Sequence, residues 1–187
     1  MEVSDKAEIF RAFDRFGKNF VVTEPIKQTG ALHQINPSSV NTVRFMTFMH
    51  DNKVTLLSAV LRMGGTGSRV DNAHGGGVFC GITNEGITKS LGWNQEFDKF
   101  DKHPNGNKFD GIRIPNYKKA VDIVKRQHMR LGHFKLVSWD VALSDDEIYI
   151  IEFNLTPQGI DLHQICNGPL FGELTDEVLG EYFSNKN

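Results

Sequence analysis

Four apolar runs rich in β-branched residues are the feature of this sequence that most constrains its fold. They form two pairs, each joined by a turn of three or four polar residues: 42–49 with 54–63, and 134–143 with 147–153. Two such runs on either side of a short polar turn are typical of an antiparallel hairpin. We therefore predict an α+β fold, built on an antiparallel β-sheet packed with helices.

In other segments apolar residues recur at helical spacing, and Gly or Pro residues mark the ends of these segments. The first is an N-terminal helix within residues 1–19, with Gly17 as its stop. Further helices are predicted at 115–132 and 174–183, and residues 31–35 are predicted to form one helical turn. These helices supply the apolar surface that covers the sheet.

Two short apolar runs predict further strands, and two segments predict loops. Residues 20–24 are rich in β-branched side chains and end at Pro25, which lacks a ladder donor, and residues 78–83 form the second run. Residues 64–77 contain closely spaced glycines, which favour a mobile loop. Residues 84–111 are polar, and we expect a long loop or ragged hairpin over the surface.

Length, composition and charge limit the classes of protein to which the chain can belong. Its 187 residues fit one domain, and 39% hydrophobic with 24% charged residues is the balance of a globular protein. The net charge of -2 includes no basic block, so nucleic acid is not an expected partner. No apolar run approaches the roughly 20 residues that span a bilayer, and the N-terminus lacks a signal-peptide pattern. We expect no membrane span and a cytoplasmic location.

Cysteine and histidine spacing gives no sign of a zinc site. Cys80 and Cys166 are the only cysteines, lie in different segments, and are predicted to be free thiols. The seven histidines do not pair at zincin spacing, which favours structural roles for them.

The second predicted hairpin brings three oxygen-bearing side chains together. Asp140 lies on its first strand, while Glu152 and Asn154 lie on the second, where alternation places both on one face. Carboxylate and amide oxygens suit Mg²⁺ better than zinc. The three residues are therefore predicted magnesium ligands, although a solvated hairpin face would show the same pattern.

Apolar residues alternate with these polar ones in the same hairpin. Trp139, Val141, Ile151 and Phe153 are the residues concerned, and we expect them to bury the opposite face of the sheet. This burial is expected whether or not the polar face binds a metal.

Arg62 and Arg69 flank the glycine-rich loop. A guanidinium group can clamp phosphate or a developing oxyanion with two hydrogen bonds while a glycine-rich backbone closes over it, so these are candidate catalytic residues. Surface arginines beside a flexible loop are also common, and residues 71–77 have the composition of a wide turn.

An ordered series of motifs runs over roughly residues 20–175, in the segments 22–25, 36–44, Arg62, 71–77, 138–140 and 151–157. The series resembles the sugar-transfer-associated branch of the ATP-grasp superfamily. The Asp and Glu-x-Asn pattern with a following Pro is also similar to that of D-alanine:D-alanine ligases and of ribosomal-protein and α-L-glutamate ligases.

The resemblance implies the C-terminal part of that fold in a single, partial ATP-grasp domain over residues 1–187. Residues 20–187 would be its nucleotide- and metal-binding half. Glu24 would meet adenine and ribose at a hinge strand, and Arg62 would contact phosphate. Asp140, Glu152 and Asn154 would hold Mg²⁺ across the phosphates of ATP.

Other positions match recurrent polar residues of the family without one assignable role. Arg44, Arg69 and Asn72 would face either the nucleotide or the acyl acceptor, and Gln158 and Asp161 would line the acceptor pocket. The implied partners are ATP, a small-molecule carboxylate and a nucleophilic acceptor, in polysaccharide or cell-surface sugar pathways. The carboxylate would take the γ-phosphate of ATP, and an amine or similar nucleophile would attack the acyl phosphate.

The resemblance is incomplete ahead of the hinge strand. ATP-grasp enzymes normally bring phosphate-contacting lysines and a glycine-rich loop there, and only nineteen residues precede Phe20. The chain would then be a fragment, a truncated gene product, or one half of a split site that a partner chain or a second copy completes. The alternatives are a non-catalytic interaction module with the same sheet and, with less support, a metal-dependent hydrolase.

Overall fold

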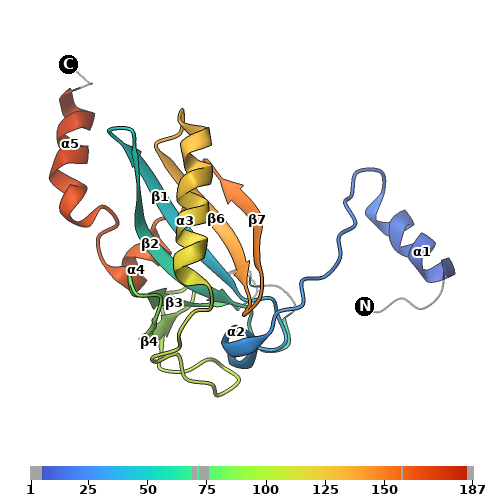
Figure 1. The fold of residues 1–187 in the computed structure, drawn as a ribbon. Coiled ribbons are helices and arrows are strands. Elements are labelled where there is room, and N and C mark those ends of the chain that lie inside the picture. The colour runs from blue at the N-terminus through green and yellow to red at the C-terminus, as the bar shows by residue number, and fades with distance from the viewer. Residues whose placement is uncertain (1–5, 69–70, 72–75, 157, 185–187) are drawn as a thin grey trace.

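An antiparallel sheet forms the centre of the computed structural model, which describes residues 6–184 except 69–70, 72–75 and 157 (Figure 1). Neighbouring strands pair antiparallel throughout the described sheet. In sheet order the described strands are β5 (Lys99–Phe100), β4 (Thr88–Trp93), β3 (Val78–Ile82), β2 (Lys53–Met63), β1 (Thr42–His50), β6 (Leu136–Leu143) and β7 (Ile148–Asn154). The predicted α+β fold class and both predicted hairpins are confirmed.

Helices precede, interrupt and follow the strands in the sequence. The described helices are α1 (Lys6–Phe16), α2 (Gly30–Ile35), α3 (Tyr117–His128) with the 3-10 turn η2 (Met129–Leu131), α4 (Asp161–Asn167), the 3-10 turn η3 (Gly172–Leu174) and α5 (Thr175–Ser184). Helices were predicted in the regions of α1, α2, α3 and α5. The prediction missed α4.

The two faces of the sheet are covered differently. On one face α3 packs against β1, β2 and β6 over the main core, which includes Phe45, Leu61 and Trp139. On the other face α4 packs on β2, β3 and β4, and a small cluster joins Val60, Phe79 and Cys166. Because α4 covers only part of its face, the rest is left for polar side chains of β1, β2 and β6.

The predicted strand at residues 20–24 is wrong. No residue there pairs in a ladder, and Val21 is 87% exposed on an extended segment between α1 and α2. A β-branched run becomes a strand only when it pairs with a partner strand, and none of the described strands pairs with this segment.

The predicted surface position of residues 84–111 needs correction. The segment contains β4 and β5, and both Phe109 and His103 are fully buried, so it is a ragged hairpin that contributes to the core. His103 Nε2 lies 2.8 Å from the backbone oxygen of Gly64, which explains how a polar segment supplies a buried residue.

The expected burial of the second hairpin's apolar face is half wrong. Trp139 and Val141 are buried, but Ile151 is 49% and Phe153 46% exposed. Their strand, β7, is at the edge of the sheet beyond the strands on which α3 packs. The contact of Phe153 with Trp139, with ring centroids 5.5 Å apart, partly shields this edge.

The N-terminal helix α1 lies apart from the body at the end of the extended segment (Figure 1). None of its residues is buried, and Gly17, at a φ of +76°, ends it as predicted. Phe13 stacks on Phe20 of the extended segment at 5.0 Å. Phe10 and Phe16 remain largely exposed, so α1 presents an apolar side to solvent.

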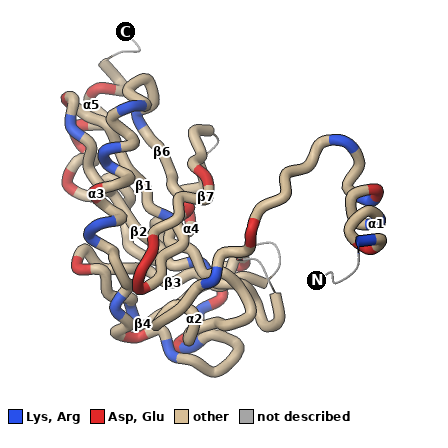
Figure 2. Tube along the Cα trace, turned by 45° about the vertical axis from the view of Figure 1, so that its right-hand side comes forward, with Lys and Arg blue, Asp and Glu red and all other residues tan. Residues whose placement is uncertain are grey.

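Charged residues of both signs are scattered along the described chain, although α2 and β3 carry none (Figure 2). This agrees with the absence of a basic block in the sequence. No helix in the described part of the chain is long and apolar enough to cross a membrane.

A buried hydrogen-bond network joins α3 to the sheet. His128 Nε2 donates to the backbone oxygen of Phe134 at 2.9 Å, so Nδ1 accepts from the Thr47 hydroxyl at 2.7 Å. The same hydroxyl accepts from Trp139 Nε1 at 2.8 Å. Burial lowers the pKa of His128, which keeps it neutral and suits a structural role.

Replacing Thr47 by valine should destabilise the fold. The change keeps the shape of the side chain but leaves Trp139 Nε1 and His128 Nδ1 without their partner, at a cost of about 1–3 kcal/mol for each group. Denaturant unfolding would measure this. Thr55→Val on β2 is the matched control, because Thr55 is only partly buried, and equal effects of the two changes would contradict the network.

Candidate functional site

A buried carboxylate held by two arginines lies on the face of the sheet that α4 leaves partly open. Asp140 of β6 is 4% exposed. Arg44 of β1 donates from Nε to Oδ1 at 2.6 Å and from Nη2 to Oδ2 at 2.5 Å. Arg62 of β2 donates from Nη1 to Oδ2 at 2.7 Å. We call these three residues the arginine–aspartate cluster.

Strand pairing explains why the cluster forms. Arg44 pairs directly with Asp140 across β1 and β6, and Arg62 pairs with Thr42 across β2 and β1. Side chains at paired positions share a face of the sheet. Three neighbouring strands therefore direct these charges to one place.

The charges of the cluster stabilise one another. Burial alone would raise the pKa of Asp140, but the hydrogen bonds and charges of Arg44 and Arg62 outweigh it and hold the pKa below its ordinary 3.8. Burial likewise acts against the charged form of Arg44, and Asp140 again outweighs it, so the pKa of Arg44 is raised. Asp140 is ionised at neutral pH.

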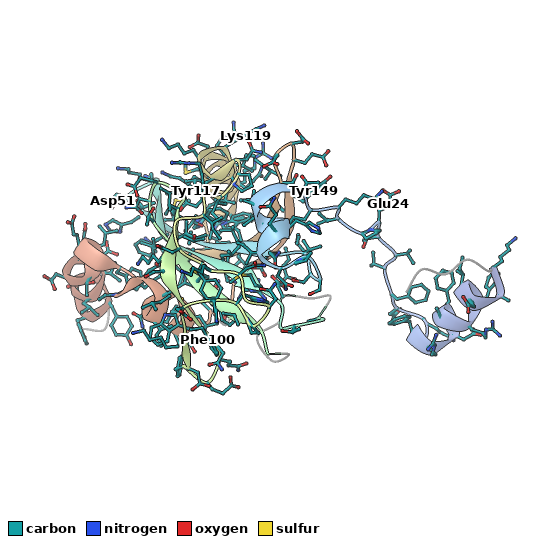
Figure 3. All side chains as sticks on the ribbon, turned by 90° about the horizontal axis from the view of Figure 1, so that it is seen from below. Glu24, Asp51, Phe100, Tyr117, Lys119 and Tyr149 are labelled. Atoms are coloured by element: carbon teal, nitrogen blue, oxygen red, sulfur yellow. The ribbon has the colours of Figure 1, made fainter. Side chains whose placement is uncertain are left out.

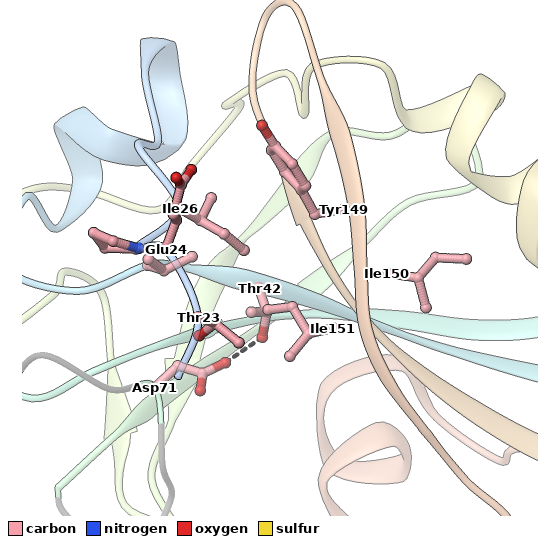
Figure 4. A pocket seen from close by; sticks show the side chains of 10 residues that line it. Thr23, Glu24, Ile26, Thr42, Asp71, Tyr149, Ile150 and Ile151 are labelled. Atoms are coloured by element: carbon pink, nitrogen blue, oxygen red, sulfur yellow. Dashed lines mark hydrogen bonds between the residues drawn. The ribbon is translucent and has the colours of Figure 1, made fainter. Parts of the chain in front are cut away.

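Asp71, in the segment that the glycine pattern predicted as a loop, extends the cluster. Its Oδ2 lies 3.7 Å from Arg62 Nε and accepts a hydrogen bond from the Thr42 hydroxyl, which Figure 4 draws as a dashed line. Arg62 thus bridges two carboxylates from different elements. The sequence placed Asp71 within a motif but assigned it no role.

The structure brings the three predicted metal ligands to one face of the β6–β7 hairpin. Asp140 pairs with Glu152, and Ser138 pairs with Asn154. Asn154 Nδ2 lies 3.5 Å from Glu152 Oε1, and Glu152 is exposed. The set supplies carboxylate and amide oxygens, which fit Mg²⁺, but both oxygens of Asp140 already accept hydrogen bonds from arginine.

Another group with ligand-type atoms lies at the opposite end of β1. Atoms of His50, Asp51 and Glu177 approach within 4.8 Å of one another. The imidazole already contacts Glu177 at 2.8 Å, which raises the pKa of His50. This group is a surface contact between the β1–β2 turn and α5.

A cavity of about 560 Å³ adjoins the cluster, because its lining includes Asp71, which lies 3.7 Å from Arg62, and Thr42, which donates a hydrogen bond to Asp71. Its walls come from the extended segment after α1, the residues before β1 and the edge strand β7. The lining residues used below are Glu24, Ile26, Thr42, Tyr149, Ile150 and Ile151, shown from close by in Figure 4.

Glu24 lines this cavity although the segment that carries it does not form the predicted strand. It lies on the segment that leads from α1 to the body, on the side of Tyr149 (Figure 3). A hydrogen bond to Glu147 chiefly raises the pKa of Tyr149, and the charge of Glu24 adds to it. Ile151, expected to bury the opposite face, instead lines this cavity.

The remaining predicted site residues are placed less centrally. Arg69 and Asn72 lie outside the described residues. Gln158 donates to the backbone oxygen of Asn154 at 2.5 Å, so its amide fastens the end of β7. Asp161 is exposed at the start of α4.

An arginine–carboxylate cluster beside a partly apolar cavity, on the open face of an antiparallel sheet, defines an α+β domain with a site suited to a phosphorylated ligand. Residues 11–178 match the family described as sugar-transfer associated ATP-grasp, and the chain belongs to that family. No curated protein and no solved structure matches the chain. The family confirms the resemblance read from the motifs and supports nucleotide binding, with ATP as the nucleotide.

Proposed function

We propose that this protein is an ATP- and Mg²⁺-dependent ligase that activates a small-molecule carboxylate as an acyl phosphate. A carboxylate oxygen bonds to the γ-phosphorus while the bond from that phosphorus to the bridging oxygen of ADP breaks. An amine or similar nucleophile then displaces phosphate. The observation that carries the proposal is the arginine–aspartate cluster, which adjoins a cavity in a chain of the ATP-grasp family.

The cavity is the proposed nucleoside site. Ile26, Ile150 and Ile151 offer apolar contact for a base, and Glu24 offers a carboxylate acceptor for ribose hydroxyls. Thr42 lines the cavity two residues before Arg44 on β1, so phosphates that leave the cavity along this strand meet the arginines.

Arg44 and Arg62 are the proposed phosphate-binding residues, and the family resemblance implies that Arg69 and Asn72 would face either the nucleotide or the acyl acceptor. Their guanidinium groups would orient the terminal phosphate and balance the charge that develops on its oxygens. Asp140, Glu152 and Asn154 would hold Mg²⁺, which supplies charge neutralisation across the phosphates. The chain's contribution is therefore positioning and electrostatics, without a covalent nucleophile.

The substrates beyond ATP are proposed from the family alone. The carboxylate and its acceptor would belong to polysaccharide or cell-surface sugar pathways, and the reaction would take place in the cytoplasm. Gln158 and Asp161 would lie on the acceptor side. A partner chain or a second copy would complete the nucleotide site from the side opposite the sheet.

A matched pair of substitutions tests the nucleoside site. Ile151→Asp places a negative charge in the cavity and should abolish the rise in melting temperature produced by Mg²⁺ with a non-hydrolysable ATP analogue. Leu179→Asp on α5 is the control, because Leu179 is 48% exposed against 49% for Ile151 and does not line the cavity. If both variants keep the rise, the nucleoside does not bind there.

The exposed apolar surface favours a second candidate function, that of a non-catalytic interaction module. The edge strand β7 exposes Ile151 and Phe153, and an apolar edge strand can pair with a second copy of itself. Sizing experiments without nucleotide would discriminate. A module predicts dimers that nucleotide does not alter and no Mg²⁺-dependent nucleotide binding, whereas Mg²⁺-dependent nucleotide binding, by a monomer or a dimer, supports the ligase.

A further inference from the structure

A histidine that the proposed mechanism does not use lies beside the arginine–aspartate cluster. His163 is in the first turn of α4, and its side chain is 1% exposed. The charged groups that act on its imidazole are Arg44, Asp140 and Arg62. One end of the imidazole is fixed, since Nδ1 lies 2.9 Å from the Ser58 hydroxyl of β2.

The surrounding hydrogen bonds determine which ring nitrogen carries the proton. Asn167 Nδ2 donates to the backbone oxygen of Ala59 at 2.9 Å and to the Ser58 hydroxyl at 2.8 Å. The hydroxyl accepts from Asn167 and has its own proton left to donate. We assign that proton to His163 Nδ1, which places the single N–H of the neutral imidazole on Nε2.

This Nε2–H is a buried donor that has no hydrogen-bond partner among the residues that the structure describes. Buried polar groups are nearly always paired, and one left unpaired calls for an explanation such as a ligand or a catalytic role. Burial, reinforced by Arg44 and Arg62 and opposed by Asp140, lowers the pKa of His163 to about 3. The ring therefore stays neutral and cannot satisfy Nε2 by forming an ion pair.

The register of the sheet places His163 relative to the nucleoside cavity. Along β1, Thr42 lines the cavity, Arg44 belongs to the cluster, and Met46 pairs with Ser58, the partner of His163. Each step of two residues along a strand covers roughly 6.5 Å. His163 thus stands beyond the arginines, at the end of the site farther from the nucleoside.

We propose that His163 contacts the substrate: its Nε2–H donates a hydrogen bond to an oxygen of the terminal phosphoryl group that passes from ATP to the carboxylate. The contact forms when Arg44 and Arg62 turn from Asp140 to the phosphates and open the space beside the imidazole. The inference rests on the proposed function and deepens it, because it assigns the transferred group to the α4 side of the cluster.

Two substitutions separate the two ring nitrogens. His163→Asn retains an acceptor near the position of Nδ1 for Ser58 but removes the Nε2 donor. His163→Gln retains an N–H near the position of Nε2 but removes the acceptor for Ser58. Calorimetric titration of the full chain with Mg²⁺ and either AMP-PNP or ADP then reports on the terminal phosphoryl group, which only AMP-PNP carries.

His163→Asn should weaken AMP-PNP about tenfold and leave ADP unchanged, whereas His163→Gln should keep the wild-type ratio of the two affinities. If His163 has a purely structural role, His163→Gln should have the lower melting temperature of the two variants without ligand. The ratio of the AMP-PNP and ADP affinities should then be unaltered in both variants. An unaltered ratio in His163→Asn overturns the inference alone. A wild-type chain that binds neither nucleotide overturns the proposed function, and this inference with it.

Discussion

Replacing Asp140 by asparagine should lower the melting temperature of the ligand-free protein and abolish its rise with Mg²⁺ and an ATP analogue. The change removes the negative charge that faces Arg44 and Arg62, and losing one partner of a buried ion pair costs about 3–5 kcal/mol. Arg44 keeps a quarter of its side chain exposed, so the lower end applies. For a chain of this length, about 3 kcal/mol corresponds to a fall of roughly 6–12 °C.

The ligand-induced rise is a separate readout of the same substitution. A ligand at about 100 times its Kd adds roughly 2.7 kcal/mol, or on the order of 5–10 °C in the wild-type protein. Asp146→Asn, in the exposed turn of the same hairpin, should leave both quantities unchanged. If Asp140→Asn is destabilised but keeps the full rise, Asp140 is structural and does not hold the metal.

The effect of Asp140 on stability should also depend on pH. Because the folded-state pKa of this carboxyl is held below 3.8, its contribution is present above that value and is lost as pH falls through the folded pKa. The difference in unfolding free energy between the wild type and Asp140→Asn should therefore narrow below about pH 4. Denaturant unfolding at a series of pH values measures this difference.

Mg²⁺ and the nucleotide should bind far more tightly together than either does alone. Both oxygens of Asp140 are engaged by arginine, so Mg²⁺ on its own must displace guanidinium groups that then lack a counter-charge. Phosphate on its own must draw Arg44 and Arg62 away from Asp140. With both ligands present, phosphate would replace Asp140 as the partner of the arginines and the Asp140 carboxylate would be free to hold Mg²⁺, so each ligand would remove the obstacle to the other.

The expected coupling is about 5–150-fold in affinity, the usual range for linked sites. It is measured by titrating Mg²⁺ with and without a saturating ATP analogue, and the analogue with and without Mg²⁺. Arg44→Gln frees Asp140 Oδ1, so it should tighten Mg²⁺ alone, weaken the nucleotide and reduce the coupling. Equal Mg²⁺ affinity in Arg44→Gln and the wild type would show that the ion pair does not compete with the metal.

Local patterns predicted most of the fold. The two hairpins and α3 were found because their signals lie within a few residues: apolar runs around a short turn, and helical spacing between Pro115 and Gly132. The strand at residues 20–24 failed because strand formation needs a neighbour that composition cannot supply. Helix α4, of seven residues, was missed, although the six-residue α2 was predicted as one helical turn.

The site was predicted in part for the same reason. Asp140, Glu152 and Asn154 share one hairpin, so alternation alone placed them on one face. The hydrogen-bonded ion pair between Arg44 and Asp140 depends on the pairing of β1 with β6, which joins positions 96 residues apart. No local pattern reports such a pairing, and the unpaired nitrogen of His163 is visible only in three dimensions.

The place of β6 between β1 and β7 has a consequence for synthesis on the ribosome. Strands β1 to β5 emerge first and can pair in order, but one edge of β1 stays open until residues 136–143 leave the exit tunnel. At about 5–20 residues per second, that edge is bare for several seconds. During this time Arg44 lies on the open strand β1 without its partner Asp140. An unpaired charge on an open strand edge opposes pairing with other nascent chains. We therefore expect Arg44, the cluster residue proposed to bind phosphate, also to disfavour aggregation of the unfinished sheet.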